Sequence, residues 1–254
     1  MAEPLLQARD ITKSFGHVRA LRGADFDVNA GEVVALIGDN GAGKSTLVKI
    51  LAGVQPHDDG QLLYEGQPVA FNDPTQAQHL GIETVFQDLA LAPDLDPAAN
   101  LFLGRELVRP GLLGRLGFLD KKRMVAETEK AFAALGAGVQ SATAPVVSLS
   151  GGQRQSIAVS RAATWANRLV IMDEPTAALG VVQSAAVLDL IRRVRDQGIA
   201  VIIISHNMPE VLEVADRVEV LRLGRRVARF DAAATDMEEL VAAMTGALVQ
   251  EGAE

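Results

Sequence analysis

Apolar and polar positions divide the chain into segments with different periods. Between Ala24 and Val28 every second residue is apolar, which predicts a strand that is buried on one face only. Other segments are almost continuously apolar, as is typical of central strands that are covered on both faces. These segments span 33–37, 168–172 and 200–205.

Shorter apolar stretches around turn residues predict two hairpins and one more strand. Residues 61–71 should form a hairpin that turns at Glu65-Gly66, and residues 218–230 should form another. Residues 82–86 predict a short strand. A helical pattern then separates the strand at 168–172 from the strand at 200–205, and strands that alternate with helices indicate a mainly parallel sheet. That helix should bury Val187, Ile191 and Val194 and present Arg192, Arg193 and Arg195 to solvent.

The middle of the chain has a different pattern. Residues 98–107 and 124–138 are spaced as helices, and Gly136 should end the second one. Residues 109–118 between them are rich in glycine and proline, which predicts an irregular link. One face of the second helix should carry Val125, Thr128, Phe132 and Leu135.

These patterns predict an α/β fold with an insertion. Residues 1–87 and 164–254 should form the core, which has a mainly parallel sheet and an N-terminal antiparallel β region. Residues 88–163 should form an α-helical subdomain that is inserted into this core.

Composition narrows the class of protein. The formal net charge of −8 disfavours a nucleic acid as partner, and the absence of cysteine excludes disulfides and thiolate metal sites. The first residues do not resemble a secretory signal, and the longest aliphatic run, 199–204, is far shorter than the ~20 residues needed to cross a bilayer. We therefore expect a soluble, cytoplasmic protein.

A glycine-rich segment at 38–45 matches the phosphate-loop pattern G-x-x-x-x-G-K-[ST]. A predicted strand precedes it and a helical pattern follows it, as this loop requires. Lys44 should reach the β- and γ-phosphates of a nucleotide, and Ser45 should bind Mg²⁺ through its hydroxyl. The residues expected to bind the nucleotide are Gly38, Asn40, Gly41, Ala42, Gly43, Lys44, Ser45 and Thr46.

Two carboxyl groups follow the predicted strand at 168–172. Ligands of a parallel sheet bind at the carboxyl ends of its strands, so both groups can face the nucleotide. Asp173 suits the Mg²⁺ shell, through water, and Glu174 suits a general base that orients the attacking water. An acidic cap at the start of a helix is the alternative interpretation.

Three further residues carry weaker signals. His206 follows a predicted strand and should contact the γ-phosphate, with a structural histidine as the alternative. Gln87 also follows a predicted strand and should touch Mg²⁺ or the attacking water, unless it is an ordinary polar boundary residue. Phe15 should stack on adenine, with core packing as the alternative.

A second small polar loop precedes another helical pattern. Its residues are Ser150, Gly151, Gly152 and Gln153, and a Ser-Gly-Gly turn at a helix N-terminus favours an anion. The chain thus carries two candidate phosphate-binding loops that lie about a hundred residues apart.

In their order and spacing, these motifs resemble the ATP-binding subunits of ABC transporters. The set comprises the phosphate loop, Gln87, LSGGQ at 149–153, the acidic pair and His206. The resemblance covers nearly the whole chain and implies the ABC ATPase variant of the P-loop NTPase fold, with ATP and Mg²⁺ bound. It also implies a head-to-tail homodimer around two ATP molecules, in which the LSGGQ loop of one copy meets the γ-phosphate held by Lys44 of the other.

Four longer stretches resemble ATPases of bacterial monosaccharide importers of the ribose, xylose and fructose type, and most of all their single-cassette, fructose-import-like members. These stretches are GIETVFQDLAL, NLFLGRE, DEPTAALG and ISHNMPEVLEVADRV. This resemblance implies a membrane permease that docks near residues 88–106, and an extracytoplasmic sugar-binding protein as an indirect partner. It places the protein at the cytoplasmic face of the bacterial inner membrane.

One position departs from the family pattern. Gly180 stands where ABC ATPases usually carry an aspartate in a loop that crosses the dimer interface, which puts the usual communication between the two sites in question. Two alternatives stay open: an ABC ATPase of another importer class, and a soluble ABC ATPase that acts on ribosomes or DNA. The negative charge and the lack of sustained heptads before LSGGQ argue against the second.

Overall fold

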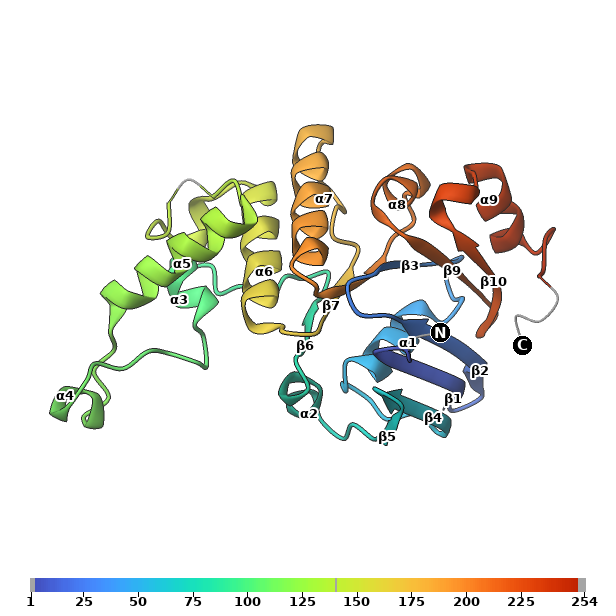
Figure 1. Cartoon of the computed structure of the whole chain (residues 1–254), viewed down its shortest axis with the longest axis horizontal. Helices are drawn as coiled ribbons and strands as arrows, with labels where there is room; N and C mark the ends of the chain where they lie inside the picture. Colours follow the sequence, from blue (N-terminus) through green and yellow to red (C-terminus); the bar gives the residue numbers. More distant parts are fainter. Residues whose placement is uncertain (1–2, 140, 251–254) are drawn as a thin grey trace.

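Two β-sheets and a group of helices make up the protein (Figure 1). The structure is a computed structural model and describes residues 3–139 and 141–250. Within these residues the larger sheet has the strand order β10-β9-β3-β8-β7-β6, and every pair of neighbours except β10 and β9 runs parallel. Its strands are β3 (Val33–Ile37), β6 (Ile82–Val85), β7 (Leu169–Asp173), β8 (Ala200–Ile204), β9 (Arg217–Arg222) and β10 (Arg225–Asp231).

The smaller sheet is antiparallel throughout, in the order β2-β1-β4-β5. The predicted turn at Glu65-Gly66 is confirmed, because Tyr64 pairs with Gln67 and both turn residues have positive φ, as a two-residue hairpin requires. The strands of this sheet are β1 (Leu6–Phe15), β2 (Val18–Val28), β4 (Asp59–Tyr64) and β5 (Gln67–Val69). A mainly parallel core with an N-terminal antiparallel region is therefore confirmed.

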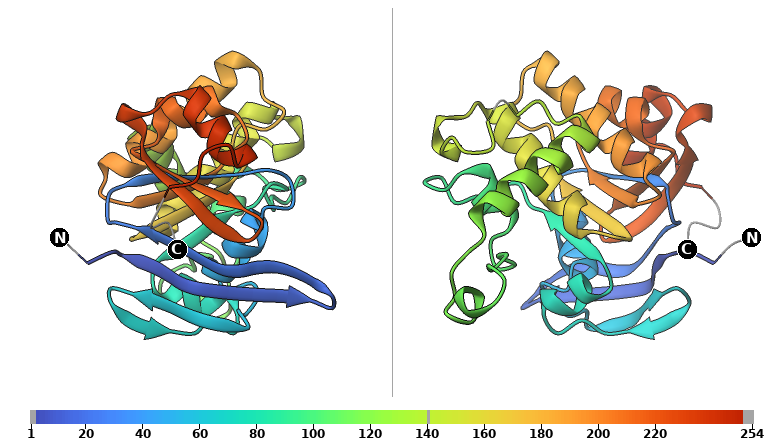
Figure 2. Two further views of the ribbon diagram at one scale, coloured as in Figure 1. Left: turned by 90° about the vertical axis from the view of Figure 1, so that its right-hand side faces the viewer. Right: turned by 60° about the vertical axis from the view of Figure 1, so that its left-hand side comes forward.

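The larger sheet is covered on both faces, which explains its continuous apolar strands. Val33, Ala35 and Ile37 of β3 join one hydrophobic cluster, while Val34 and Leu36 join the other. Helix α1 (Lys44–Leu51) lies between the two sheets, and the opposite face is covered by four helices (Figure 2). These are α6 (Gly151–Trp165), α7 (Val181–Asp196), α8 (Met208–Val214) and α9 (Met237–Thr245).

Helix α7 has the orientation that its sequence predicts. Val187, Ile191 and Val194 are fully buried. Arg192 and Arg195 lie on the solvent side, where they form ion pairs with nearby carboxylates. No helix among the described residues is both long and apolar enough to span a membrane.

The helical region beside the sheets differs from the sequence prediction in three details. Helix α3 (Pro97–Leu101) ends well before residue 107, because the chain turns at Phe102 and Gly104 has positive φ. The segment expected to be irregular contains a single helical turn, α4 (Leu112–Arg115). On α5 (Lys121–Leu135), Met124 rather than Val125 completes the buried face, and Gly136 ends the helix as predicted. The remaining short elements are α2 (Pro74–His79), η1 (Val146–Ser148) and η2 (Ala232–Ala234).

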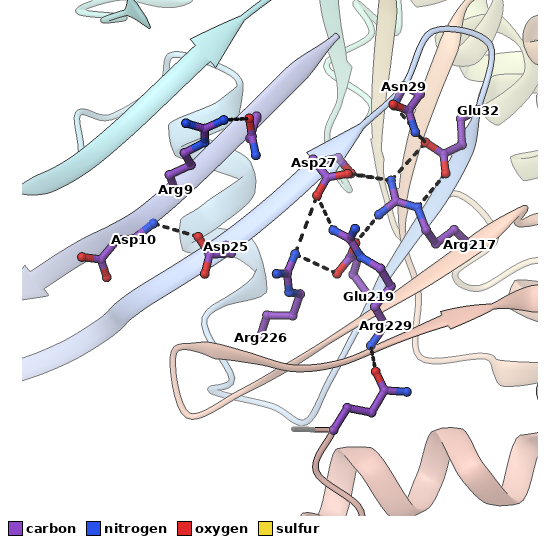
Figure 3. A network of polar contacts seen from close by, with 12 residues as sticks. Arg9, Asp10, Asp25, Asp27, Asn29, Glu32, Arg217, Glu219, Arg226 and Arg229 are labelled. Atoms are coloured by element: carbon purple, nitrogen blue, oxygen red, sulfur yellow. Dashed lines mark hydrogen bonds and ion pairs between the residues drawn. The ribbon is translucent and has the colours of Figure 1, made fainter. Parts of the chain in front are cut away.

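A network of charged side chains joins β2 to the β9–β10 hairpin (Figure 3). It contains three acidic residues and three arginines, so its formal charges balance. At its centre lies Glu219, whose side chain is 1% exposed and contacts the guanidinium groups of Arg217 and Arg229. The other members are Asp27, Glu32 and Arg226.

Candidate functional site

The phosphate loop connects β3 to α1, the strand–loop–helix context that its sequence predicts. Gly38 has φ 151°, and a Cβ atom there would lie 2.1 Å from the Leu221 carbonyl oxygen, so only glycine fits. In this loop Asn40 and Gly41 are exposed and Ala42 is buried. Gly43 is the N-cap of α1, and the first residues of the helix are Lys44, Ser45 and Thr46.

The Lys44 side chain folds across this loop. Its ammonium donates hydrogen bonds to the carbonyl oxygens of Gly38 at 2.6 Å and Asp39 at 3.1 Å. Burial lowers the pKa of Lys44, and the negative charge of Glu174 is the largest influence in the opposite direction. Lys44 is thus electrostatically coupled to a carboxylate that lies 130 residues later in the chain.

The acidic pair stands at the carboxyl end of β7. Asp173 is the last residue of the strand, and burial raises the pKa of its carboxyl, with further help from the charge of Glu174. Glu174 has φ 51°, a left-handed conformation that is uncommon for a residue with a side chain. Its backbone N–H donates to the Ile204 carbonyl at 2.9 Å, which ties the turn to the neighbouring strand β8.

Two strand ends bring histidine and glutamate together. His206 Nδ1 lies 2.8 Å from Glu174 Oε1, so the two side chains share a hydrogen bond. Gln87 and Glu174 both line a cavity of about 310 Å³. The predicted placement of these groups at the carboxyl edge of the parallel sheet is therefore correct, whereas their chemical roles stay predictions.

The second loop forms the N-terminal cap of α6. Ser150 and Gln153 form a capping box, in which the Ser150 hydroxyl accepts from the Gln153 N–H and the Gln153 side chain accepts from the Ser150 N–H. Gly151 lines the same cavity as Glu174, but no residue of 38–46 does. A Cβ atom on Gly152 would lie 2.7 Å from Cγ of Gln183, so glycine permits the close approach of α7.

Phe15 is not a core residue. It ends β1 with 49% of its surface exposed, and the Lys13 ammonium lies 5.9 Å from its ring centroid. The core-packing alternative is therefore wrong, and adenine stacking stays a prediction.

Gly180, the departure from the family pattern, is the N-cap of α7 and supplies no side-chain hydrogen bond to the helix.

Sequence reasoning missed Arg161 on α6. Its guanidinium donates to the carbonyl oxygens of Leu89 at 3.0 Å and Ala90 at 2.8 Å. Both acceptor residues have positive φ, which side chains disfavour, so Arg161 stabilises an unusual backbone just after Gln87. The available signal was an arginine in the middle of a helix that is otherwise rich in small residues.

Comparisons with known proteins agree with this geometry. Residues 21–177 match the family model described as ABC transporter. The chain is 49% identical to the fructose import ATP-binding protein FrcA of Rhizobium meliloti, over 96% of this chain and 95% of that protein. It is 47% identical to the xylose/arabinose import ATP-binding protein XylG of Sulfolobus acidocaldarius, over 95% and 94%. With the ribose import ATP-binding protein RbsA of Yersinia pestis the identity is 45%, but the match spans only 46% of that protein.

Solved structures also superpose over nearly the full length. An ATP-binding cassette of an ABC transporter, MJ1267 in its ADP conformation, matches with a TM-score of 0.78 and 27% identity over 95% of both chains. A nucleotide-free cassette matches with a TM-score of 0.77 and 26% identity, also over 95% of both. Fold, site geometry and sequence agree, and the chain belongs to the ABC transporter family of ATP-binding proteins.

Proposed function

We propose that this protein is the ATP-hydrolysing subunit that energises monosaccharide import through a membrane permease. The observation that carries the proposal is the cluster formed by Lys44, Glu174 and His206 at one edge of the parallel sheet. The sugar class rests on the names of the relatives FrcA, XylG and RbsA, two of which match over nearly their whole length.

The phosphate loop is the proposed cradle for ATP. Its backbone N–H groups and Lys44 would face the β- and γ-phosphates, where the half-buried ammonium would supply the positive charge that these groups need. The exposed ring of Phe15 is available to stack on the adenine.

Magnesium fits the oxygen donors of this site. The Ser45 hydroxyl, the Asp173 carboxylate and the Gln87 amide oxygen are hard ligands, and Mg²⁺ takes few such protein ligands together with water and phosphate oxygens. When bound, the ion supplies neutralising charge to the transferring phosphoryl group. Burial and the charge of Glu174 raise the pKa of Asp173, although Lys44 and Lys49 act in the opposite direction, and a bound cation would favour the ionised carboxylate.

Glu174 is the proposed general base. One of its oxygens is hydrogen-bonded to His206, so the carboxylate is oriented while its other oxygen can accept a proton from water. That water attacks the γ-phosphorus, the bond to the leaving ADP breaks, and the proton passes to Glu174. Gln87, which lines the same cavity, helps to position the water.

A second copy of this chain is the proposed partner in hydrolysis. None of residues 38–46 lines the cavity that Gly151 lines, which supports a role for the Ser150–Gln153 loop at another nucleotide. The N–H groups of Gly151 and Gly152, which the capping box does not use, begin a 15-residue helix whose dipole favours a γ-phosphate. Closure of the head-to-tail dimer then depends on ATP, because each γ-phosphate contacts the phosphate loop of one copy and the Ser150–Gln153 loop of the other.

The proposed docking site for the permease is a groove of about 300 Å³ beside α3 and α5. Apolar side chains such as Leu103 and Met124 line it. Asp94, Asp96 and Glu106 outnumber its one basic side chain, Lys121, so the groove is acidic. Cytoplasmic loops of membrane proteins are rich in lysine and arginine, so an acidic groove suits them. The groove lies within residues 88–163, the proposed helical subdomain, and the assembly sits at the cytoplasmic face of the bacterial inner membrane with a sugar-binding protein on the far side.

Affinity purification of the tagged protein from native membranes in mild detergent tests this proposal. Mass spectrometry should identify a multi-span permease and a sugar-binding protein, and the binding protein can then be screened against monosaccharides. A known importer from the same cells serves as the control for complex stability. Ribosomal or DNA-associated proteins in place of a permease would support the soluble alternative and contradict import.

A further inference from the structure

Residues 107–120 form a projecting arm, of which only Leu119 lines the groove proposed for the permease. The stem of the arm pairs residues 107–109 with residues 118–120, through hydrogen bonds from Arg109 N–H to Phe118 O and from Asp120 N–H to Leu107 O. Helix α4 forms the tip. Figure 1 shows the tip at the far end of the molecule, away from both sheets, and the right-hand view of Figure 2 agrees.

The arm concentrates exposed apolar surface. Six of the eighteen exposed large apolar side chains among the described residues belong to it. Leu112 and Leu116, one helical turn apart, are 72% and 66% exposed, and Phe118 is 54% exposed. The other three are Val108, Leu113 and Leu119. Such a concentration of exposed apolar side chains in one short segment is a feature of interaction sites.

Basic side chains accompany these apolar groups. Residues 106–123 carry five basic and two acidic side chains, a net charge of +3, in a chain whose formal net charge is −8. Within the described part of the chain none of these five basic groups forms an ion pair, and only Lys121 lines the acidic groove; the nearest ion pairs along the chain are those of Arg105 with Glu83 and Lys130 with Glu127. They are Arg109, Arg115, Lys121, Lys122 and Arg123.

We infer that the arm docks on an anionic lipid surface, with Leu112, Leu116 and Phe118 entering the headgroup region and the basic side chains contacting lipid phosphates. Leucine and phenylalanine beside lysine and arginine are the chemistry of interfacial membrane binding. Permease loops at the cytoplasmic face are themselves basic and would repel the arm, whereas they suit the acidic groove at its base. This inference rests on the proposed function, because only a membrane-bound importer brings the arm to a bilayer.

Vesicle co-sedimentation of the full-length protein, without permease, tests the inference. One set of vesicles contains phosphatidylcholine alone, and the other contains phosphatidylcholine and phosphatidylglycerol in equal amounts. The arm variants are Leu112→Ser with Leu116→Ser, and Arg109→Gln with Arg115→Gln. The matched control combines Val241→Ser on α9 with Arg225→Gln on β10, which remove an exposed apolar group and an exposed charge elsewhere. Because all of these side chains are exposed, circular dichroism and basal ATPase activity should not change.

The wild-type protein and the control should bind the anionic vesicles and release them at high salt. Loss of each arginine should lower the partition coefficient roughly fivefold, and the leucine variant should also bind more weakly. Equal binding to both vesicle types, or equal binding by the arm variants, would overturn the inference. Arm variants that bind vesicles normally but no longer co-purify with the permease would also overturn the inference, since the arm would then contact the permease. In each of these failures the wild-type protein still co-purifies with the permease, so the failure is distinct from a failure of the import function.

Discussion

Replacement of Glu219 by glutamine tests how the charged network in Figure 3 responds to pH. The carboxyl is 1% exposed, and its Oε1 lies 2.8 Å from Nε of Arg229, while its Oε2 lies 3.6 Å from Nη1 of Arg226. Burial raises the pKa of Glu219 to about 7, although the nearby arginines lower it. Glutamine keeps the size of the side chain and cannot ionise, so it isolates the contribution of the charge.

The expected magnitude follows from the difference in pKa between the folded and the unfolded chain. An increase from 4.5 to about 7 corresponds to about 3 kcal/mol in the free energy of unfolding. Because the folded state holds the proton more tightly, the contribution of Glu219 is fully present below pH 4.5 and is lost as the pH rises through 7. The free energy of unfolding of the wild type, minus that of Glu219→Gln, should therefore decrease by about 3 kcal/mol as the pH rises over that range. The difference is most in favour of the wild type at acid pH.

Urea unfolding of both proteins, followed by circular dichroism between about pH 5 and about pH 8 at constant ionic strength, measures this difference. The other carboxylates titrate in both proteins, so their effects cancel in the comparison. A difference that stays constant with pH would refute the reasoning. A difference that grows in favour of the wild type as the pH rises would show that the arginines outweigh burial and keep Glu219 ionised throughout.

Three other changes test the proposed site. Glu174→Gln should reduce steady-state ATP hydrolysis by more than ~100-fold, because the general base is lost. Gel filtration with ATP should still show the dimer. Near-normal ATP turnover would contradict the role of Glu174 as the base. Arg161→Ala should free Leu89 and Ala90, the two residues with positive φ after Gln87, and lower ATP turnover. Arg161→Lys should keep only part of the turnover, because an ammonium group lacks the planar set of donors that a guanidinium offers to two carbonyl oxygens. Equal turnover in the wild type and both variants would show that this contact does not position the site. In urea unfolding, Gly38→Ala should lower the free energy of unfolding by more than Gly41→Ala. The new Cβ at position 38 would lie 2.1 Å from a carbonyl oxygen, whereas Gly41 has open space around it and incurs only the ~1–2 kcal/mol cost of positive φ. Equal decreases in the free energy of unfolding would contradict the packing argument.

The sequence by itself determined the central strands, the phosphate loop and the positions of the polar groups that end those strands, whereas β1 (Leu6–Phe15) was not predicted. Continuous apolar runs identify β3, β7 and β8 because a parallel strand is buried on both faces whatever its neighbours are. Asp173 and His206 could be placed at one edge because all parallel strands point their carboxyl ends the same way. Such inferences need only local periodicity and the direction of the chain.

Tertiary structure alone decided which distant side chains meet. Arg161 contacts a backbone 71 residues away, and no periodicity predicts that acceptors turned to positive φ will face it. Glu219 occupies an unremarkable position in an alternating strand, and its pKa depends on β2 and β10 packing around it. The exposure of Phe15 likewise depends on what covers the end of β1. Burial and electrostatic coupling are sums over neighbours in space, so they become defined only when the sheets and helices have packed together.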